Sequence, residues 1–137
     1  MPRPDLAAML VPLGRALTAA ERPILDAHDL SMWGYVVLSR LADEPVRAQA
    51  ALAEAIGADK TRLIPVLDEL QSAGLIERRP APDDRRARVL TITDLGRERR
   101  DAARAEIQAA EERVLAVLTA DQRAVFVTAL QTLLASL

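Results

Sequence analysis

The spacing of apolar residues departs from a helical period over one short stretch of this chain, and that departure limits its possible folds more than any other feature. Near the start, apolar residues recur every three or four positions, as on one face of a helix: Leu6, Leu10, Leu13 and Leu17. Residues 75–78 and 88–92 instead have the length and composition of short strands. Pro80, Pro82 and Asp83-Asp84 between them favour a turn. The sequence therefore predicts a mainly helical protein with one small β-hairpin.

Capping residues indicate where the helices begin and end. Helices that start at a capping Ser31, Asp59 or Thr93 are expected over about 31–42, 59–72 and 93–118. A short helix over 49–56 is expected to end at Gly57, and Gly74 is expected to close the helix that precedes it.

Two further stretches resemble capping boxes. Thr119 and Gln122 predict the start of a last helix. Thr18 and Glu21 have the same spacing, and Pro23 follows in the next turn. Residues 5–27 are therefore expected to form either two short helices or one kinked helix.

Length and composition restrict the class of protein. A chain of 137 residues is most simply one domain, 1–137, with a core of Leu, Val and Ala because only Trp33, Tyr35 and Phe126 are aromatic. The absence of cysteine excludes disulfides, thiolate metal sites and cysteine nucleophiles. The start lacks a signal-peptide pattern, and no apolar run approaches the roughly 18 residues of a membrane span. We expect a soluble cytoplasmic protein without a membrane partner.

Charge is unevenly distributed although the formal net charge is only −2. Residues 60–104 contain 11 basic and 8 acidic residues, whereas the rest of the chain contains 7 basic and 12 acidic residues. This asymmetry favours one basic face suited to a polyanion and a different role for the remainder.

The order of elements is that of a winged helix-turn-helix. Two short helices joined by a glycine-containing turn are followed by a basic hairpin. Ala53 is small where the helices must cross, Gly57 suits a turn with positive φ, and Leu63 is placed to pack the second helix onto the first.

Residues 29–96 resemble the MarR family of transcription regulators. The resemblance lies in these motifs: Asp29-Leu30-Ser31, Tyr35, Val37-Leu38, Leu52-Ala53, Ile56-Gly57, Asp68, Leu70, Gly74 to Arg78, Asp84-Arg85-Arg86, Ile92-Thr93 and Gly96. It implies a DNA-binding lobe over 31–104 and dimerisation helices over 1–30 and 105–137. It also implies a homodimer that binds a pseudo-palindromic operator in double-stranded DNA.

The DNA-binding residues expected from this arrangement form three groups. Lys60, Thr61 and Arg62 begin the recognition helix, where Arg can fork onto guanine and Thr can touch a thymine methyl. Arg85 and Arg86 lie at the wing, where a narrow minor groove attracts arginine, and Asp84 is expected to fix the turn. The flanking candidates for phosphate contacts are Arg47, Gln49, Arg78 and Arg79. Four further arginines are expected on a solvated helix face: Arg97, Arg99, Arg100 and Arg104.

Pro65 departs from the family pattern, which usually has a basic residue there. A proline inside a helix removes a donor and clashes one turn back. We therefore expect a bend or local unwinding near residues 61–65.

A ligand cleft is expected between the dimer arm and the DNA-binding lobe. Trp33 lies on a different helix face from Tyr35, which is expected in the core. With His28, Met9 and Met32, Trp33 could line the cleft in which members of this family bind small aromatic or phenolic effectors. Ordinary packing of Trp33 against the first helix is the alternative interpretation.

No cofactor, metal site or enzymatic activity is expected. His28 with Asp26 and Asp29 has poor metal-ligand spacing, and the acidic pairs at 43–44 and 83–84 lack a nucleophile or base nearby. The sequence thus predicts a sequence-specific transcription regulator, a repressor released by a small aromatic or phenolic ligand. Pro65 and the negative net charge favour the alternative, a dimeric helical interaction protein with a degenerate DNA-binding lobe.

Overall fold

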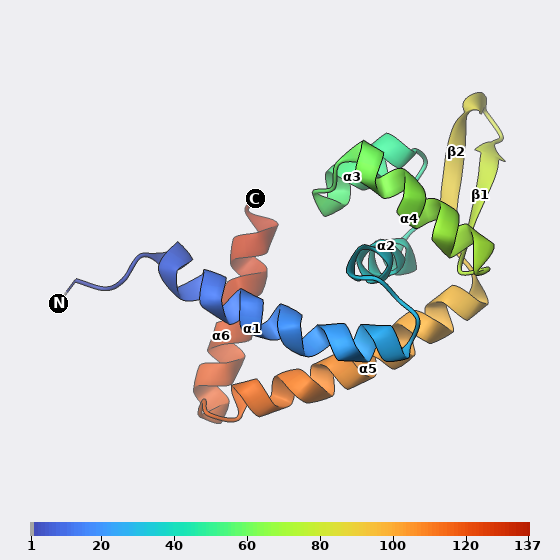
Figure 1. Cartoon of the computed structure of the whole chain (residues 1–137). Helices are drawn as coiled ribbons and strands as arrows, with labels where there is room; N and C mark the ends of the chain where they lie inside the picture. Colours follow the sequence, from blue (N-terminus) through green and yellow to red (C-terminus); the bar gives the residue numbers. More distant parts are fainter. Residues whose placement is uncertain (1) are drawn as a thin grey trace.

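The computed structural model describes residues 2–137 and divides them between a helical arm and a lobe (Figure 1). In order, the elements are α1 (Leu6–Ala27), α2 (Met32–Asp43), α3 (Gln49–Ile56), α4 (Lys60–Ser72), β1 (Ile76–Ala81), β2 (Asp84–Ile92), α5 (Asp94–Leu115) and α6 (Ala120–Ala135). The long helices α1 and α5 lie side by side and α6 turns back from the end of α5 behind α1, whereas α2, α3, α4 and the hairpin gather at the other end (Figure 1). The predicted fold class is confirmed.

Side-chain caps set most of the predicted boundaries. Ser31 Oγ accepts a hydrogen bond from Gly34 N at 2.9 Å, and Asp59 Oδ1 accepts one from Thr61 N at 3.2 Å. Thr93 Oγ1 accepts from Gly96 N at 3.0 Å, and Thr119 forms the predicted capping box with Gln122. The helix after Thr93 ends at Leu115 rather than at Leu118.

The first helix is continuous, so the capping box predicted at Thr18 and Glu21 is wrong. Pro12 and Pro23 both lie inside α1. Each ring is exposed, and so are the residues four positions earlier, whose carbonyls lose their usual donor. Water can satisfy those carbonyls, while packing along α5 holds the opposite face of α1 in place.

The recognition helix α4 is also continuous, and the unwinding expected at Pro65 does not occur. Leu63, Leu67 and Leu70 are buried along one side of this helix and anchor it on both sides of the proline. Pro65 itself faces solvent, as does Thr61, whose carbonyl would otherwise accept the missing hydrogen bond.

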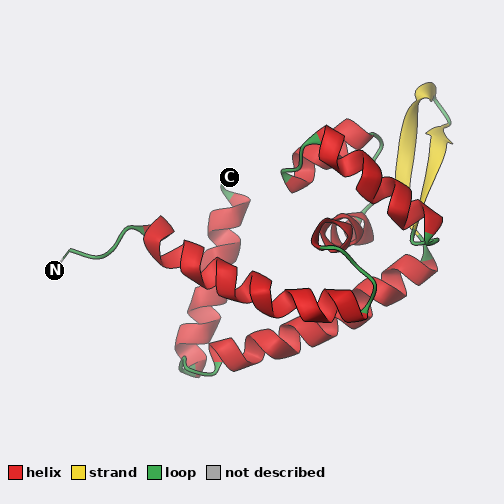
Figure 2. Ribbon diagram, viewed as in Figure 1, coloured by secondary structure: helices red, strands yellow, loops and turns green. Residues whose placement is uncertain are grey.

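The hairpin is longer than predicted, with only Pro82 and Asp83 left between the strands (Figure 2). Pairing runs from Ile76 opposite Ile92 to Ala81 opposite Asp84, with an irregularity after Pro80. A proline is tolerated in β1 because this strand has a free edge and a bulge follows. Asp84 Oδ1 accepts a hydrogen bond from Arg86 N at 2.9 Å, as expected of a residue that fixes the turn.

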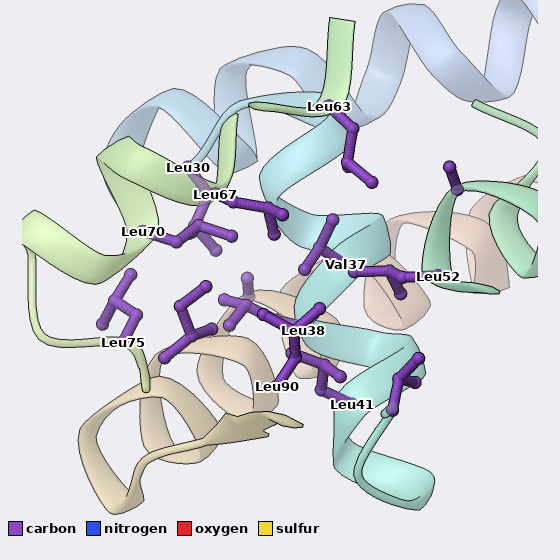
Figure 3. Close-up of a cluster of buried hydrophobic side chains, with 14 of the residues drawn as sticks. Leu30, Val37, Leu38, Leu41, Leu52, Leu63, Leu67, Leu70, Leu75 and Leu90 are labelled. Carbon is purple, nitrogen blue, oxygen red and sulfur yellow. The ribbon is translucent and has the colours of Figure 1, made fainter. Parts of the chain in front are cut away.

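The core lies where α2, α3, α4, α5 and the hairpin meet (Figure 3). Ala53 and Leu63 are buried in it, and Gly57 has φ 69°, as the helix-turn-helix spacing predicted. Arg100 is buried as well, with 7% of its surface exposed, so its predicted place on a solvated face is wrong. Within residues 2–137, no helix is both long and apolar enough to cross a membrane.

Candidate nucleic-acid interface

The start of α4 presents the residues predicted to contact bases. Lys60, Thr61 and Arg62 are all exposed. Within residues 2–137, neither Lys60 nor Arg62 lies within salt-bridge distance of an acidic group. The positive end of the helix dipole adds to the two cationic side chains, so this corner of the lobe is suited to a phosphate or a base edge.

The wing supplies a second exposed basic group. Arg85 and Arg86 project from the start of β2, next to the turn, and both are exposed. Arg47, from the segment before α3, forms an ion pair with Asp83 in that turn. Both partners are largely exposed, and such pairs contribute little to stability, so Arg47 can exchange Asp83 for a phosphate at little cost.

Arg78 lies in a hydrogen-bonded network rather than on an open surface. Its guanidinium donates to Gln49 Oε1 at 3.1 Å, to Asp68 Oδ1 at 2.6 Å and to Gln71 Oε1. These contacts join β1 to α3 and α4. The structure thus brings the predicted residues Arg78 and Gln49 together, and it uses three of the five guanidinium N–H donors of Arg78 within the protein. Arg79, by contrast, is exposed and pairs with Glu77 at 2.7 Å.

A cleft of about 350 Å³ separates the end of α1 from α2 and α4. Trp33 and Met32 line it, together with Arg22, Asp26 and Glu69. Arg22 escaped the sequence analysis, although its position one turn before the buried Leu25 places it beside the core end of α1.

The other two residues predicted for this cleft lie elsewhere. His28 Nε2 is 3.1 Å from Glu106 Oε1, so it joins α1 to α5. Met9 lies near the start of α1, roughly 24 Å from Leu25 at the rise of an α-helix, and is 43% exposed. The four predicted ligand residues therefore do not form one site.

A polar cluster connects α1, α2 and α5 beneath the lobe. Burial raises the pKa of Tyr35, while the hydrogen bond from Ser39 and the nearby charges of Arg100 and Arg104 act in the opposite direction. Burial also raises the pKa of Glu21, with a further contribution from Glu111. Arg100 Nε lies 3.2 Å from Asp101 Oδ1, at an angle outside that of a hydrogen bond.

The arm carries a large apolar cleft of about 610 Å³ between α1, α5 and α6. Leu10, Leu17, Val114 and Phe126 are among the residues that line it. Every residue of α6 keeps part of its surface exposed, and Leu134 is 66% exposed. An apolar surface of this extent is uncommon on a soluble monomer.

A helix-turn-helix with a basic hairpin, held between long helical arms, defines a winged helix-turn-helix protein. The model of the MarR family matches residues 30–87. The HTH-type transcriptional repressor Rv2887 of Mycobacterium tuberculosis is 33% identical over 131 residues, which make up 96% of this chain and 84% of that protein. The chain belongs to the MarR family of transcription regulators.

Solved structures of that relative share the fold. Rv2887 in complex with DNA is 30% identical and superposes with a TM-score of 0.80, covering 96% of this chain and 98% of the other. The same protein in complex with p-aminosalicylic acid is 29% identical, with a TM-score of 0.80 and coverage of 95% and 98%.

Proposed function

We propose that this chain is a homodimeric repressor of transcription that binds a pseudo-palindromic operator and leaves it when a small aromatic acid binds. The observation that carries the proposal is the pairing of two exposed basic groups on one lobe. Lys60 and Arg62 begin the recognition helix, and Arg85 and Arg86 extend from the wing. A major groove admits such a helix, and the wing can then follow the backbone or the adjacent minor groove.

The apolar arm cleft supports a symmetric dimer. The clefts of two copies could be filled by each other's α1 and α6, which would bury Leu134 and its neighbours. Dimerisation sets the distance between the two α4 helices, and that distance must match half-sites about one turn of DNA apart.

The cleft at Trp33 supports an aromatic acid as the ligand. Trp33 offers an indole face, Met32 an adaptable apolar wall, and Arg22 a guanidinium for a carboxylate. The cleft lies between the arm helix α1 and the recognition helix α4. A ligand there can favour one arm-to-lobe arrangement and so change the spacing of the recognition helices.

The alternative, a helical interaction protein with a degenerate DNA-binding lobe, has less support now that α4 is continuous through Pro65. Fluorescence anisotropy with DNA from upstream of this protein's own gene separates the two. We expect a preference for that DNA over random duplex of at least about 10³-fold. Arg62→Ala should cost about 1–3 kcal/mol on the preferred site and much less on random DNA. Equal affinity for all duplexes would favour the alternative.

A further inference from the structure

We infer that the recognition helix selects thymine through an apolar strip formed by Thr61, Ile64 and Pro65. The inference rests on the proposed function, because it concerns which bases the bound operator must contain. It adds Ile64 and Pro65, two residues without any side-chain hydrogen-bonding group, to the residues that meet DNA.

The continuity of α4 places these residues on one surface. Leu63, Leu67 and Leu70 define the buried side of the helix. At about 100° per residue, Thr61 and Pro65 lie one turn apart and nearly opposite that side. Ile64 lies beside them, three positions after Thr61, and all three residues are exposed.

The apolar cleft of the arm does not explain why Ile64 is exposed. Most other large apolar residues exposed in residues 2–137 belong to α1, the end of α5 or α6, near the apolar cleft. Ile64 is 41% exposed on α4, in the lobe that carries the basic wing. An isoleucine there would gain burial if the helix entered a groove.

The chemistry of the strip points to one base. Beyond Arg62, the outward face of α4 offers few donors, because Ile64 and Pro65 are apolar and the carboxylates of Asp68 and Glu69 only accept hydrogen bonds. Such a surface cannot form the paired hydrogen bonds that read guanine or adenine. The C5 methyl of thymine is the apolar group that base pairs present in the major groove. The rigid ring of Pro65 and the methyl of Thr61 can contact such a methyl with little loss of side-chain freedom.

The test begins with selection of tight-binding duplexes from a random library by the intact protein. We expect thymines at fixed positions within each half-site. Each is then replaced by deoxyuridine, which removes only the methyl and keeps the base pair. Loss of one buried methyl should weaken binding about fourfold at each contacted position. Deoxyuridine outside the half-sites provides the control and should leave affinity unchanged.

Variants of the protein link the effect to the strip. Ile64 is partly exposed and a proline is unfavourable inside a helix, so Ile64→Ala and Pro65→Ala should both fold. In each, replacing the contacted thymine with deoxyuridine should change affinity less than about twofold, whereas Arg62→Ala should keep the fourfold effect. The inference would be overturned if the selected sites had no fixed thymines. It would also be overturned if the deoxyuridine effect persisted in both strip variants. Failure to select any sequence would instead overturn the proposed function.

Discussion

Arg78 of β1 donates a hydrogen bond to Asp68 of α4 across 2.6 Å, and its remaining bonds reach Gln49 of α3 and Gln71 of α4. One guanidinium therefore fixes the recognition helix against the helix before it and the wing after it. The Arg78 side chain is mostly buried and Asp68 is more exposed. We therefore propose that Arg78 is a positioning residue, which acts on DNA binding through the placement of α4.

Arg78→Ala should weaken operator binding without changing its salt dependence. Loss of hydrogen bonds to a charged group should also lower the free energy of unfolding by about 1–3 kcal/mol. Arg78→Lys should behave similarly, because an ammonium cannot bridge the same three acceptors in their fixed positions. Arg79→Ala, at an exposed neighbour, is the matched control for stability. A salt slope shallower by about one in Arg78→Ala would show instead a direct phosphate contact.

Replacement of both wing arginines, Arg85 and Arg86, with Ala should weaken binding to all duplexes. Because both side chains are exposed, thermal stability should change little. The slope of log affinity against log salt should become shallower by about two units if each arginine neutralises one phosphate. The measurement is anisotropy over a series of salt concentrations, and an unchanged slope would remove the wing from the interface.

Gly96→Ala should destabilise the lobe by more than about 2 kcal/mol through steric overlap. A Cβ at this position would overlap the carbonyl oxygen of Leu75 and press on Ile92. Thermal and urea unfolding measure the loss. Glu98→Ala, at an exposed position two residues along α5, should stay within about 0.5 kcal/mol of the parent. Equal stability of the two variants would mean that α5 can shift away from Leu75 freely.

Aromatic acids such as p-aminosalicylate should quench Trp33 fluorescence and weaken operator binding together. Trp33 is the sole tryptophan, so its signal reports on the cleft. Arg22→Ala should weaken ligand binding because it removes the cation for the carboxylate, whereas Met9→Ala should not, because Met9 lies outside the cleft. A tenfold preference for the DNA-free state corresponds to about 1.4 kcal/mol, and operator DNA must then weaken ligand binding tenfold. Equal ligand affinity in the parent and in Arg22→Ala would show that Arg22 does not bind the carboxylate.

Leu134→Glu should convert the dimer to a folded monomer with weak DNA binding. The substitution places a charge within the apolar arm cleft, and Leu134 is exposed in the single chain, so the lobe should be unaffected. Sedimentation velocity at micromolar concentration measures assembly, and circular dichroism checks the fold. Ala102→Glu is the matched control, because Ala102 is exposed on α5 and lies outside the lining of the cleft. A dimer that persists in Leu134→Glu would place the interface on another face.

Local chemistry explains which parts of the fold were predictable. The caps at Ser31, Asp59 and Thr93 act over two or three residues, so the sequence identifies them directly. The helices α1 and α4 continue through Pro23 and Pro65 because the opposite face of each helix is packed. Local helix propensity carries no information about that packing.

In the candidate site, too, some features follow from the sequence and others depend on tertiary packing. The exposed residues at the start of α4 and on the wing follow from their order in the chain. The capture of Arg78 by Asp68 and Gln49 depends on how α3, α4 and β1 meet in space. Met9, predicted to line the ligand cleft with Trp33 and Met32, lies far from them because α1 is one continuous helix.

The backbone pairing of Val46 with Leu90, through hydrogen bonds of 3.0 and 2.7 Å, occupies the outer edge of β2 at its apolar end. Farther along that strand, Arg85, Arg86 and Arg88 carry positive charge. Unpaired strand edges otherwise recruit strands from neighbouring molecules, and like charges prevent this. At high concentration, and whenever operator DNA is scarce, the β2 edge of the wing should therefore resist edge-to-edge aggregation.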